Sequence, residues 1–210
     1  MKTKTETKRQ AILDEAARAF RELGYEGASM SEIRARVGGS KATLYNYFAS
    51  KDELFFEVMT ASCEAEFQAA HASMDPTTGD IEQSLRHFGE RFLSFLYSPE
   101  VQANRHLSIA ESGRTKLGQL LYERGVLRSQ RLVAESIREA MAQGKLRTAD
   151  PMLATQHLYA LLEAELIDRF LLQLLGEVSK AEIEAITARA LAVFMAAYGP
   201  ASDQAAAKSR

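Results

Sequence analysis

The sequence predicts an all-α protein in which a small N-terminal three-helix domain precedes a larger helical bundle. Strand-like alternation of polar and apolar residues is absent, and the 210 residues include only 4 prolines and 12 glycines. Helix start and stop signals recur along the chain and divide it into about nine helices. Hydrophobic residues make up 46% of the sequence, which is enough to form a core in each domain.

The first two predicted helices lead into a tight turn. An amphipathic helix ends at Gly24, because glycine suits the position just after a helix end. Ser29 and Glu32 form a Ser-x-x-Glu capping box that starts the second helix. Gly38 and Gly39 then provide the short turn that a helix-turn-helix unit requires.

The third predicted helix lies within SKATLYNYFASKDELF, residues 40–55, and has one apolar and one polar face. Ser40 is a good N-cap, and Leu44 and Phe48 lie four residues apart on the inward face. The outward face carries small, hydrogen-bonding and basic groups, namely Ala42, Thr43 and Asn46, with Lys41, Tyr45 and Tyr47 at its flanks. Ser50 starts the fourth helix, and Lys51 lies in its first turn, where free amides can hold a phosphate.

The later helices are delimited by proline, glycine and N-cap residues. They are predicted from residue 51 to about 71, from 80 to 96, from 99 to about 110, from a poorly marked start to 144, from 150 to 176 and from 179 to 199. We expect a first domain at residues 1–56, a second at residues 57–200, and a disordered tail at residues 201–210.

Basic residues are concentrated at the N-terminal end of the chain. Residues 1–51 contain ten Lys or Arg and six Asp or Glu, whereas the rest of the chain contains sixteen and twenty-two. A basic end on a mildly acidic chain favours phosphate binding by that end alone. The basic residues before position 10 form either a solvated arm or an arm that contacts a nucleic-acid backbone: Lys2, Lys4, Lys8 and Arg9.

Several motifs in residues 8–56 are similar to those of a known protein family. They are Ala16, Phe20 and Gly24-Tyr25 in the first helix, SMSEI at residues 29–33, and the LYNYF and SKDELF runs. With these motifs the segment resembles the DNA-binding head of the tetracycline-repressor (TetR) family of bacterial transcription regulators, in an AcrR-like form. Two residues depart from the family pattern: Gly39 replaces an aliphatic residue and Ala42 replaces a glycine. We expect Gly39 to loosen the turn by about 0.5 to 1 kcal/mol, and Ala42 either to hold the helix farther from DNA or to meet a thymine methyl.

The resemblance implies a transcription regulator that binds double-stranded operator DNA through its helix-turn-helix head. The outward face of the third helix would read base edges, and the flanking groups would contact the backbone. The residues expected at the DNA are Ser29, Ser40, Lys41, Ala42, Thr43, Tyr45, Asn46, Tyr47 and Lys51. Two heads of a homodimer would read inverted half-sites, so the operator should be a pseudo-palindrome. We expect a repressor, with an activator as the alternative.

Residues 85–175 resemble the AefR-like regulatory domain of one subgroup of this family. The matching motifs are Arg105-His106-Leu107, Ala110-Glu111, Gly144-Lys145-Leu146 and Asp150-Pro151. The resemblance implies a small-molecule effector, largely apolar, that binds inside the bundle and releases the protein from DNA. Expected wall residues, for which ordinary core packing is the alternative, are Phe88, Phe92, Phe95, Tyr122, Tyr159 and Phe170.

Residues 158–175 are apolar on more than one helical face, so this helix needs cover on two sides. The second cover is either a second copy of the chain or the rest of the same monomer. In the family, the last two helices pair with their copies in a four-helix interface. The expected interface residues are Leu158, Leu162, Leu166, Phe170, Ile186, Leu191 and Phe194.

Other classes of function have little support in the sequence. We see no catalytic motif and expect no enzyme, no cofactor and no metal site, since His87 with Glu90 is too weak a pattern for a metal. Cys63 is the single cysteine, so an internal disulfide is excluded. We expect the charged N-terminal segment to be neither a signal peptide nor a membrane anchor, and we expect a cytoplasmic protein. The alternative function is an all-α interaction protein whose head binds a protein partner instead of DNA.

Overall fold

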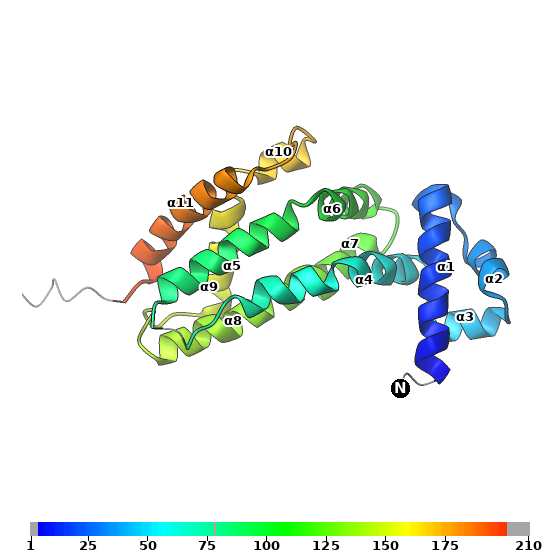
Figure 1. Ribbon diagram of the computed structural model, residues 1–210, viewed down its shortest axis with the longest axis horizontal. Coiled ribbons are helices and arrows are strands. Elements are labelled where there is room, and N and C mark those ends of the chain that lie inside the picture. The colour runs from blue at the N-terminus through cyan, green and yellow to red at the C-terminus, as the bar shows by residue number, and fades with distance from the viewer. Residues whose placement is uncertain (1–3, 78, 201–210) are drawn as a thin grey trace, which may run out of the picture. The chain divides into compact units, whose positions relative to one another are not determined.

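The computed structural model describes residues 4–77 and 79–200, and within these ranges the chain forms helices and no strand (Figure 1). The predicted all-α class is therefore confirmed. Lys2 and the predicted tail at residues 201–210 lie outside the described residues. Within the described ranges, no helix combines the length and the apolar character needed to cross a membrane.

The helices follow one another in a simple order. They are α1 (Lys4–Gly27), α2 (Met30–Val37), α3 (Lys41–Tyr47), α4 (Lys51–Ala72), α5 (Ile81–Leu96), α6 (Pro99–Glu111), α7 (Leu117–Leu120), the π-helix η1 (Leu121–Val126), α8 (Leu127–Ala142), α9 (Pro151–Glu163), α10 (Ile167–Leu171) and α11 (Lys180–Tyr198).

Side-chain caps start the helices where the sequence predicts them. Ser29, Ser40 and Ser179 each accept a hydrogen bond from the backbone N–H three residues later. Asp80 does the same for α5, and Asp150 accepts two backbone N–H groups at the start of α9. Each cap satisfies donors that a helix N-terminus leaves without an intrahelical partner, so these five predicted starts are confirmed.

One predicted helix ends where expected, and another is interrupted. Gly24 has φ 71° and ψ 174°, so the backbone leaves helical geometry at the predicted end of the first helix, and the residues from there to Gly27 form a short stretch beyond a kink in α1. The predicted helix over residues 150–176 breaks after Glu163, since Leu166 has φ −113° and the next helix, α10, ends at Leu171. Gln173 then takes a positive φ of 56°, which ends any helical continuation. Apolar residues on more than one helical face concealed the break, because they obscured the amphipathic period.

The chain divides into two compact units, and the division does not follow chain order. The first unit, here called the head unit, contains the residues up to Glu64 together with Asn104–Arg124. The second, here called the regulatory unit, contains Ala65–Ala103 and the chain from Gly125 onward. The sequence places residues 104–124 in the second domain, whereas the structure groups them with α1, α2 and α3.

Each unit has its own apolar core. In the head unit, Ile12, Ile33, Leu44 and Leu54 are almost fully buried, and Leu117 from α7 joins them. In the regulatory unit, α5, α8, α9 and α11 pack side by side (Figure 1). Their buried faces, together with Phe170 of α10, supply the larger core. The core residues with no exposed surface include Leu85, Phe88, Ile137, Leu158, Leu162, Phe170 and Phe194.

Candidate nucleic-acid interface

The turn between α2 and α3 depends on two glycines in left-handed backbone conformations. Gly38 ends α2 with φ 70°, and Gly39 follows with φ 103°. Side chains with a Cβ atom rarely adopt such angles. Ile33 of α2 and Leu44 of α3 are both buried in the head core, so the two helices meet across this turn. Gly39 therefore supplies a backbone conformation that the turn uses. The sequence alone suggests only that Gly39 removes an aliphatic side chain and loosens the turn.

The α3 helix presents the predicted polar face to solvent. Lys41, Ala42, Tyr45 and Asn46 are exposed, and Thr43 and Tyr47 are half-buried. Leu44 and Phe48 have 3% and 1% of their surface exposed. The predicted division of this helix into inward and outward faces is confirmed, and the contacts of the outward face with DNA stay a prediction.

Hydrogen bonds and stacking order several of the predicted DNA-binding side chains. Ser40 Oγ accepts the Thr43 N–H at 3.1 Å and lies 2.9 Å from Thr43 Oγ1. Lys41 Nζ lies 5.6 Å from the centroid of the Tyr45 ring. Ser29 is exposed, and its Oγ accepts the Glu32 N–H at the start of α2. The hydroxyls of Ser29 and Ser40 thus cap helices, which leaves Asn46 and Lys41 as the longer polar groups on the face.

Lys51 points toward α1 in this structure. Its Nζ donates a hydrogen bond to the Tyr25 carbonyl oxygen at 2.8 Å and lies 4.2 Å from the Tyr25 ring centroid. Such a cation above an aromatic face is attracted by the ring quadrupole. A phosphate contact by Lys51, which remains a prediction, would have to share or break this bond.

Sequence reasoning missed a second polar contact at the same place. The Tyr25 hydroxyl donates to Asp52 Oδ1 at 2.6 Å. Burial, followed by the hydrogen bond to Asp52, raises the pKa of the Tyr25 phenol above its usual range. The neutral phenol therefore remains a donor that ties the end of α1 to the start of α4. The TetR-like Gly24-Tyr25 motif was the signal that could have drawn attention to it.

Four of the six predicted effector-wall residues gather in the regulatory unit. The Phe88 and Phe92 ring centroids are 5.4 Å apart, and the Phe92 and Tyr159 centroids are 4.6 Å apart. Phe95 is half-buried and its ring lies 6.0 Å from Phe67. These residues come from α4, α5 and α9 and form one aromatic cluster.

A buried polar chain that the sequence did not predict adjoins the aromatic cluster. His71 Nε2 lies 2.7 Å from Ser129 Oγ, which in turn lies 2.6 Å from the Tyr159 hydroxyl. His71 Nδ1 lies 2.7 Å from the Phe67 carbonyl oxygen. Because a carbonyl only accepts, Nδ1 carries a proton, and a neutral His71 accepts from Ser129 while Ser129 accepts from Tyr159. The three side chains, which are distant in sequence, thus form one chain of hydrogen bonds in which Tyr159 donates to Ser129 and Ser129 donates to His71.

Two other predicted wall residues lie outside this aromatic cluster, and their place at an effector stays a prediction. Tyr122 belongs to η1 and has 55% of its surface exposed, and it falls in the head unit. Phe170 has no exposed surface and packs against Tyr97, with ring centroids 6.0 Å apart. Aromatic composition alone could not separate these positions, because the interrupted helices place them on different elements.

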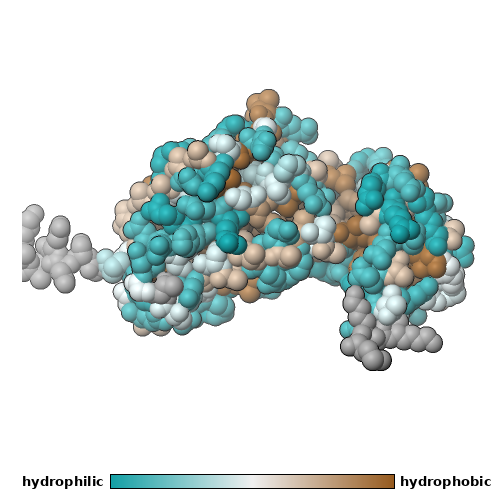
Figure 2. Space-filling view, viewed as in Figure 1, coloured by the Kyte–Doolittle hydropathy of each residue, from teal (hydrophilic) through white to brown (hydrophobic). Residues whose placement is uncertain are grey.

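The seven predicted dimer-interface residues are buried within one chain. Leu158, Leu162, Leu166, Phe170 and Phe194 have no exposed surface, and Leu191 and Ile186 retain 1% and 2%. They form part of the core of their own regulatory unit and leave little surface for a second copy, and their place at a dimer interface stays a prediction. Large apolar groups that are exposed on the regulatory unit include Leu153 of α9, Val193 of α11, and Leu171, Leu172 and Leu174 in and after α10. Figure 2 shows a hydrophobic projection near the place where Figure 1 draws α10.

A three-helix head with two capped helices, a two-glycine turn and an exposed polar face on α3 defines a helix-turn-helix DNA-binding protein. Comparison with known families agrees. Residues 12–58 match the model for bacterial regulatory proteins of the tetR family, and residues 83–200 match the C-terminal domain of AefR-like transcriptional repressors. The chain belongs to the TetR family of transcription regulators.

Several relatives cover most of the chain. A TetR-family transcriptional regulator from Mesorhizobium loti is 29% identical, has a TM-score of 0.79, and is matched over 94% of this chain and 100% of its own. The flavonoid-responsive regulator FrrA is 31% identical, with a TM-score of 0.77 and matches over 93% and 99%. The HTH-type transcriptional regulator YhgD of Bacillus subtilis is 23% identical over 70% of this chain and 75% of its own length.

Proposed function

We propose that this protein is a repressor that binds a pseudo-palindromic operator as a homodimer and leaves it when a largely apolar small molecule binds the regulatory unit. The observation that carries the proposal is the outward face of α3, where Lys41, Ala42 and Asn46 are exposed above a buried Leu44 and Phe48. An α-helix fits the major groove, where base edges present distinct donors and acceptors. The match to AefR-like repressors supports repression over activation.

The exposed sides of α9 and α11 support a homodimer. On α11, Ala185, Ala192 and Ala196 are exposed next to Val193, which has 54% of its surface accessible. Small side chains allow two helices to approach closely, and Leu153 of α9 adds an apolar group with 48% exposure. We propose that these residues, in place of the buried leucines and phenylalanines, contact the second copy.

The aromatic cluster of the regulatory unit supports an effector with aromatic or extended apolar surface. Phe88, Phe92 and Tyr159 supply the apolar contacts, and the chain of His71, Ser129 and Tyr159 supplies polar groups within the same unit. Ligand sites commonly combine such walls with a few placed polar groups. The relation to a flavonoid-responsive regulator suggests aromatic compounds as the first class to test.

Helix α4 is the element that we propose couples the two activities. Residues 51–64 belong to the head unit, and residues 65–72 belong to the regulatory unit. A continuous helix transmits a displacement at one end to the other. A tenfold loss of operator affinity requires only about 1.4 kcal/mol of differential effector binding between the two conformations.

The proposal is tested by selection from a random double-stranded DNA library with the purified protein. We expect an inverted repeat to be enriched and to bind with one homodimer per site. Fluorescence anisotropy of the labelled duplex then gives the affinity, which is convenient because the protein has no tryptophan. Enrichment of no duplex would favour the alternative in which the head binds a protein partner.

Two further measurements separate the parts of the proposal. Val193→Glu should reduce the dimer fraction in sedimentation and weaken operator binding, whereas Leu132→Glu, at an exposed leucine of α8, should leave the dimer intact. Naringenin, as a flavonoid, and stearic acid, as an aliphatic probe, are titrated against the complex with DNA. Release by neither compound would count against these two effector classes, and release by stearic acid alone would favour an aliphatic effector.

A further inference from the structure

The Asn104–Arg124 segment is attached to the head by contacts along its length. Leu117 is fully buried in the head core, and Leu107, Leu120 and Leu121 pack against that core. The Lys116 N–H donates to Asp52 Oδ2 at 2.8 Å, next to the bond between Asp52 and Tyr25. The segment therefore holds the first turn of α4 before the chain reaches Arg124.

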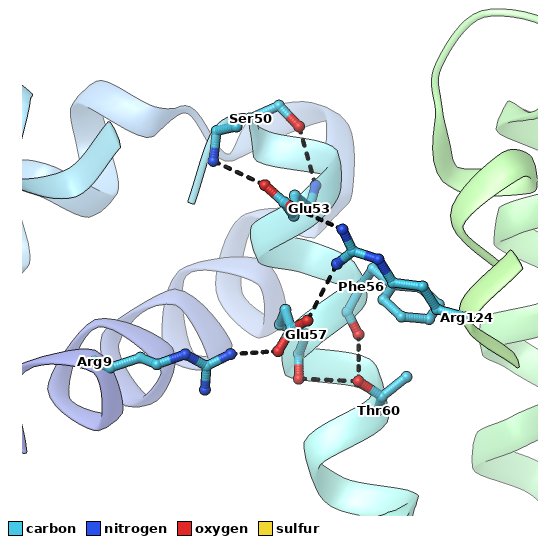
Figure 3. Close-up of polar contacts among 8 residues, drawn as sticks. Arg9, Ser50, Glu53, Phe56, Glu57, Thr60 and Arg124 are labelled. Atoms are coloured by element: carbon cyan, nitrogen blue, oxygen red, sulfur yellow. Dashed lines mark hydrogen bonds and ion pairs between the residues drawn. The ribbon is translucent and has the colours of Figure 1, made fainter. Parts of the chain in front are cut away.

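Arg124 of η1 bridges two carboxylates that lie one turn apart on α4 (Figure 3). Its Nη2 donates to Glu53 Oε1 at 2.7 Å, and its Nη1 donates to Glu57 Oε1 at 3.3 Å. The hydrogen bond from Arg124 is the largest cause that lowers the pKa of the Glu53 carboxyl below its ordinary range. A planar guanidinium with a fixed fork of donors suits this bridge better than a lysine ammonium does.

Glu53, which Arg124 holds, also binds the residue that follows the C-cap of α3. Its second oxygen, Oε2, accepts the Ala49 N–H at 2.9 Å, and its own N–H donates to Ser50 Oγ at 3.1 Å (Figure 3). Ala49 directly follows Phe48, which is the C-cap of α3. The turn between α3 and α4 is thus closed by a carboxylate that Arg124 holds.

Glu57, the second carboxylate that Arg124 holds, is connected to Phe48 through Arg9. Its Oε2 accepts a hydrogen bond from Arg9 Nη2, and the Arg9 guanidinium carbon lies 5.2 Å from the Phe48 ring centroid. The two carboxylates bridged by Arg124 therefore lead to two adjacent residues, Phe48 and Ala49, at the end of α3. Neither route passes through the outward face of that helix.

We propose that Arg124 is a positioning residue for DNA recognition, which fixes the C-terminal end of α3 through Glu53 and Glu57 without touching DNA. The proposal rests on the function proposed above. The side chain of Arg124 is 44% exposed, and such ion pairs contribute little to overall stability. Its effect should instead appear in operator affinity, because a preorganised helix loses less freedom on binding.

The first test measures binding of the selected duplex by the full-length protein over a series of KCl concentrations. Arg124→Gln should weaken operator affinity about three- to tenfold and leave the slope of log K against log salt unchanged. Arg124→Lys should recover only part of the loss, since one ammonium cannot reproduce the two-carboxylate bridge. A slope that falls by about one unit would overturn the proposal, because Arg124 would then be binding a phosphate itself.

Matched variants distinguish the positioning role of Arg124 from a general effect of losing one positive charge. Arg138→Gln removes the same charge from an exposed ion pair with Glu135 on α8 and should leave operator affinity as in the wild type. Glu53→Gln combined with Arg124→Gln should lose little more affinity than Arg124→Gln alone, since both changes break the same contact between Arg124 and Glu53. Equal losses for Arg138→Gln and Arg124→Gln, or strictly additive losses in the double variant, would contradict a specific bridge.

A second test needs no DNA. Amide hydrogen exchange, followed by NMR on the same variants, should show faster exchange of the Ala49 N–H in Arg124→Gln by about three- to tenfold, with α5 amides unchanged. Unchanged exchange at Ala49 together with unchanged operator affinity would refute the positioning role. If the wild type selects no duplex, the proposed function fails, and the exchange result alone then decides whether Arg124 orders the end of α3.

Discussion

Gly89 of α5 packs directly against Thr187 of α11. A Cβ atom placed on Gly89 would lie 2.8 Å from Thr187 Cγ2 and 3.0 Å from Leu162 Cδ2. Both neighbours are fully buried. The two helices therefore cross at a distance that only a glycine allows.

Gly89→Ala should destabilise the regulatory unit by about 1 to 3 kcal/mol, because the added methyl group forces buried side chains or the backbone to move. Thermal unfolding followed by circular dichroism measures the change. Gly176→Ala is the control, since a Cβ there meets nothing within 4 Å. Equal unfolding temperatures for Gly89→Ala and the wild type would show that the helices can separate without cost.

Gly39→Ala should destabilise the head by about 1 to 3 kcal/mol, because φ 103° is a strained conformation for any residue with a Cβ atom. Chemical denaturation with a probe of helix content measures this effect, and operator affinity should fall with it. Gly113→Ala lies in the same unit, with open space around its Cβ and no positive φ, and should change little. A stabilised Gly39→Ala would instead support the view that this glycine only loosens the turn.

Lys51→Ala and Asn46→Ala should weaken DNA binding in different ways. Lys51→Ala should reduce affinity for all duplexes alike and flatten the salt dependence by about one unit of slope, whereas Asn46→Ala should relax the preference at one base position. Selection and anisotropy with each variant give both quantities. If Lys51→Ala kept the full salt slope, its hydrogen bond to the Tyr25 carbonyl would be its main role.

The Glu53 carboxylate makes the unfolding free energy of the head depend on pH in the acidic range. Its pKa is held below the ordinary value of 4.5 by Arg124 first and by the Ala49 amide second. A depressed folded-state pKa gives stability that is complete above the unfolded-state pKa and is lost as the pH falls through the folded one. The unfolding free energy of the wild type should therefore drop more steeply below about pH 4.5 than that of Glu53→Gln. Parallel curves would mean that other carboxylates dominate acid unfolding.

Ser129→Ala should destabilise the regulatory unit by about 1 to 3 kcal/mol, because it removes the hydroxyl that joins Tyr159 to His71 and leaves buried polar groups without that partner. Thermal unfolding measures the loss. Ser94→Ala removes an exposed hydroxyl that donates to a carbonyl on its own helix and should change stability far less. Equal effects of the two variants would indicate that water replaces the Ser129 hydroxyl.

Local chemistry made the head and the helix starts predictable. Ser29, Ser40, Asp80, Asp150 and Ser179 act over three residues or fewer, so their caps follow from the sequence alone. The inward Leu44 and Phe48 followed from a spacing of four on a single short helix. In each case the information lies within one or two helical turns.

Contacts over long sequence distances were not predictable in this way. Leu166 lies where the helix predicted over residues 150–176 breaks, and no change of period in the sequence marks this break. The same excess of apolar residues suggested a dimer face, whereas Leu158 and Leu162 are covered by their own unit. Arg124 and Glu53 are separated by 71 positions, and nothing local in either segment predicts their contact.

The burial of Leu117 in the head bears on how regulators of this type can be recombined. A hybrid that joined residues 1–64 to a foreign sensor would leave behind Leu117, the Lys116 amide and Arg124. Such a hybrid would expose apolar surface on α4 and lose the groups that hold Asp52 and Glu53. The exchangeable DNA-binding module of this protein is therefore discontinuous, and a functional transplant must carry residues 104–124 along with the N-terminal helices.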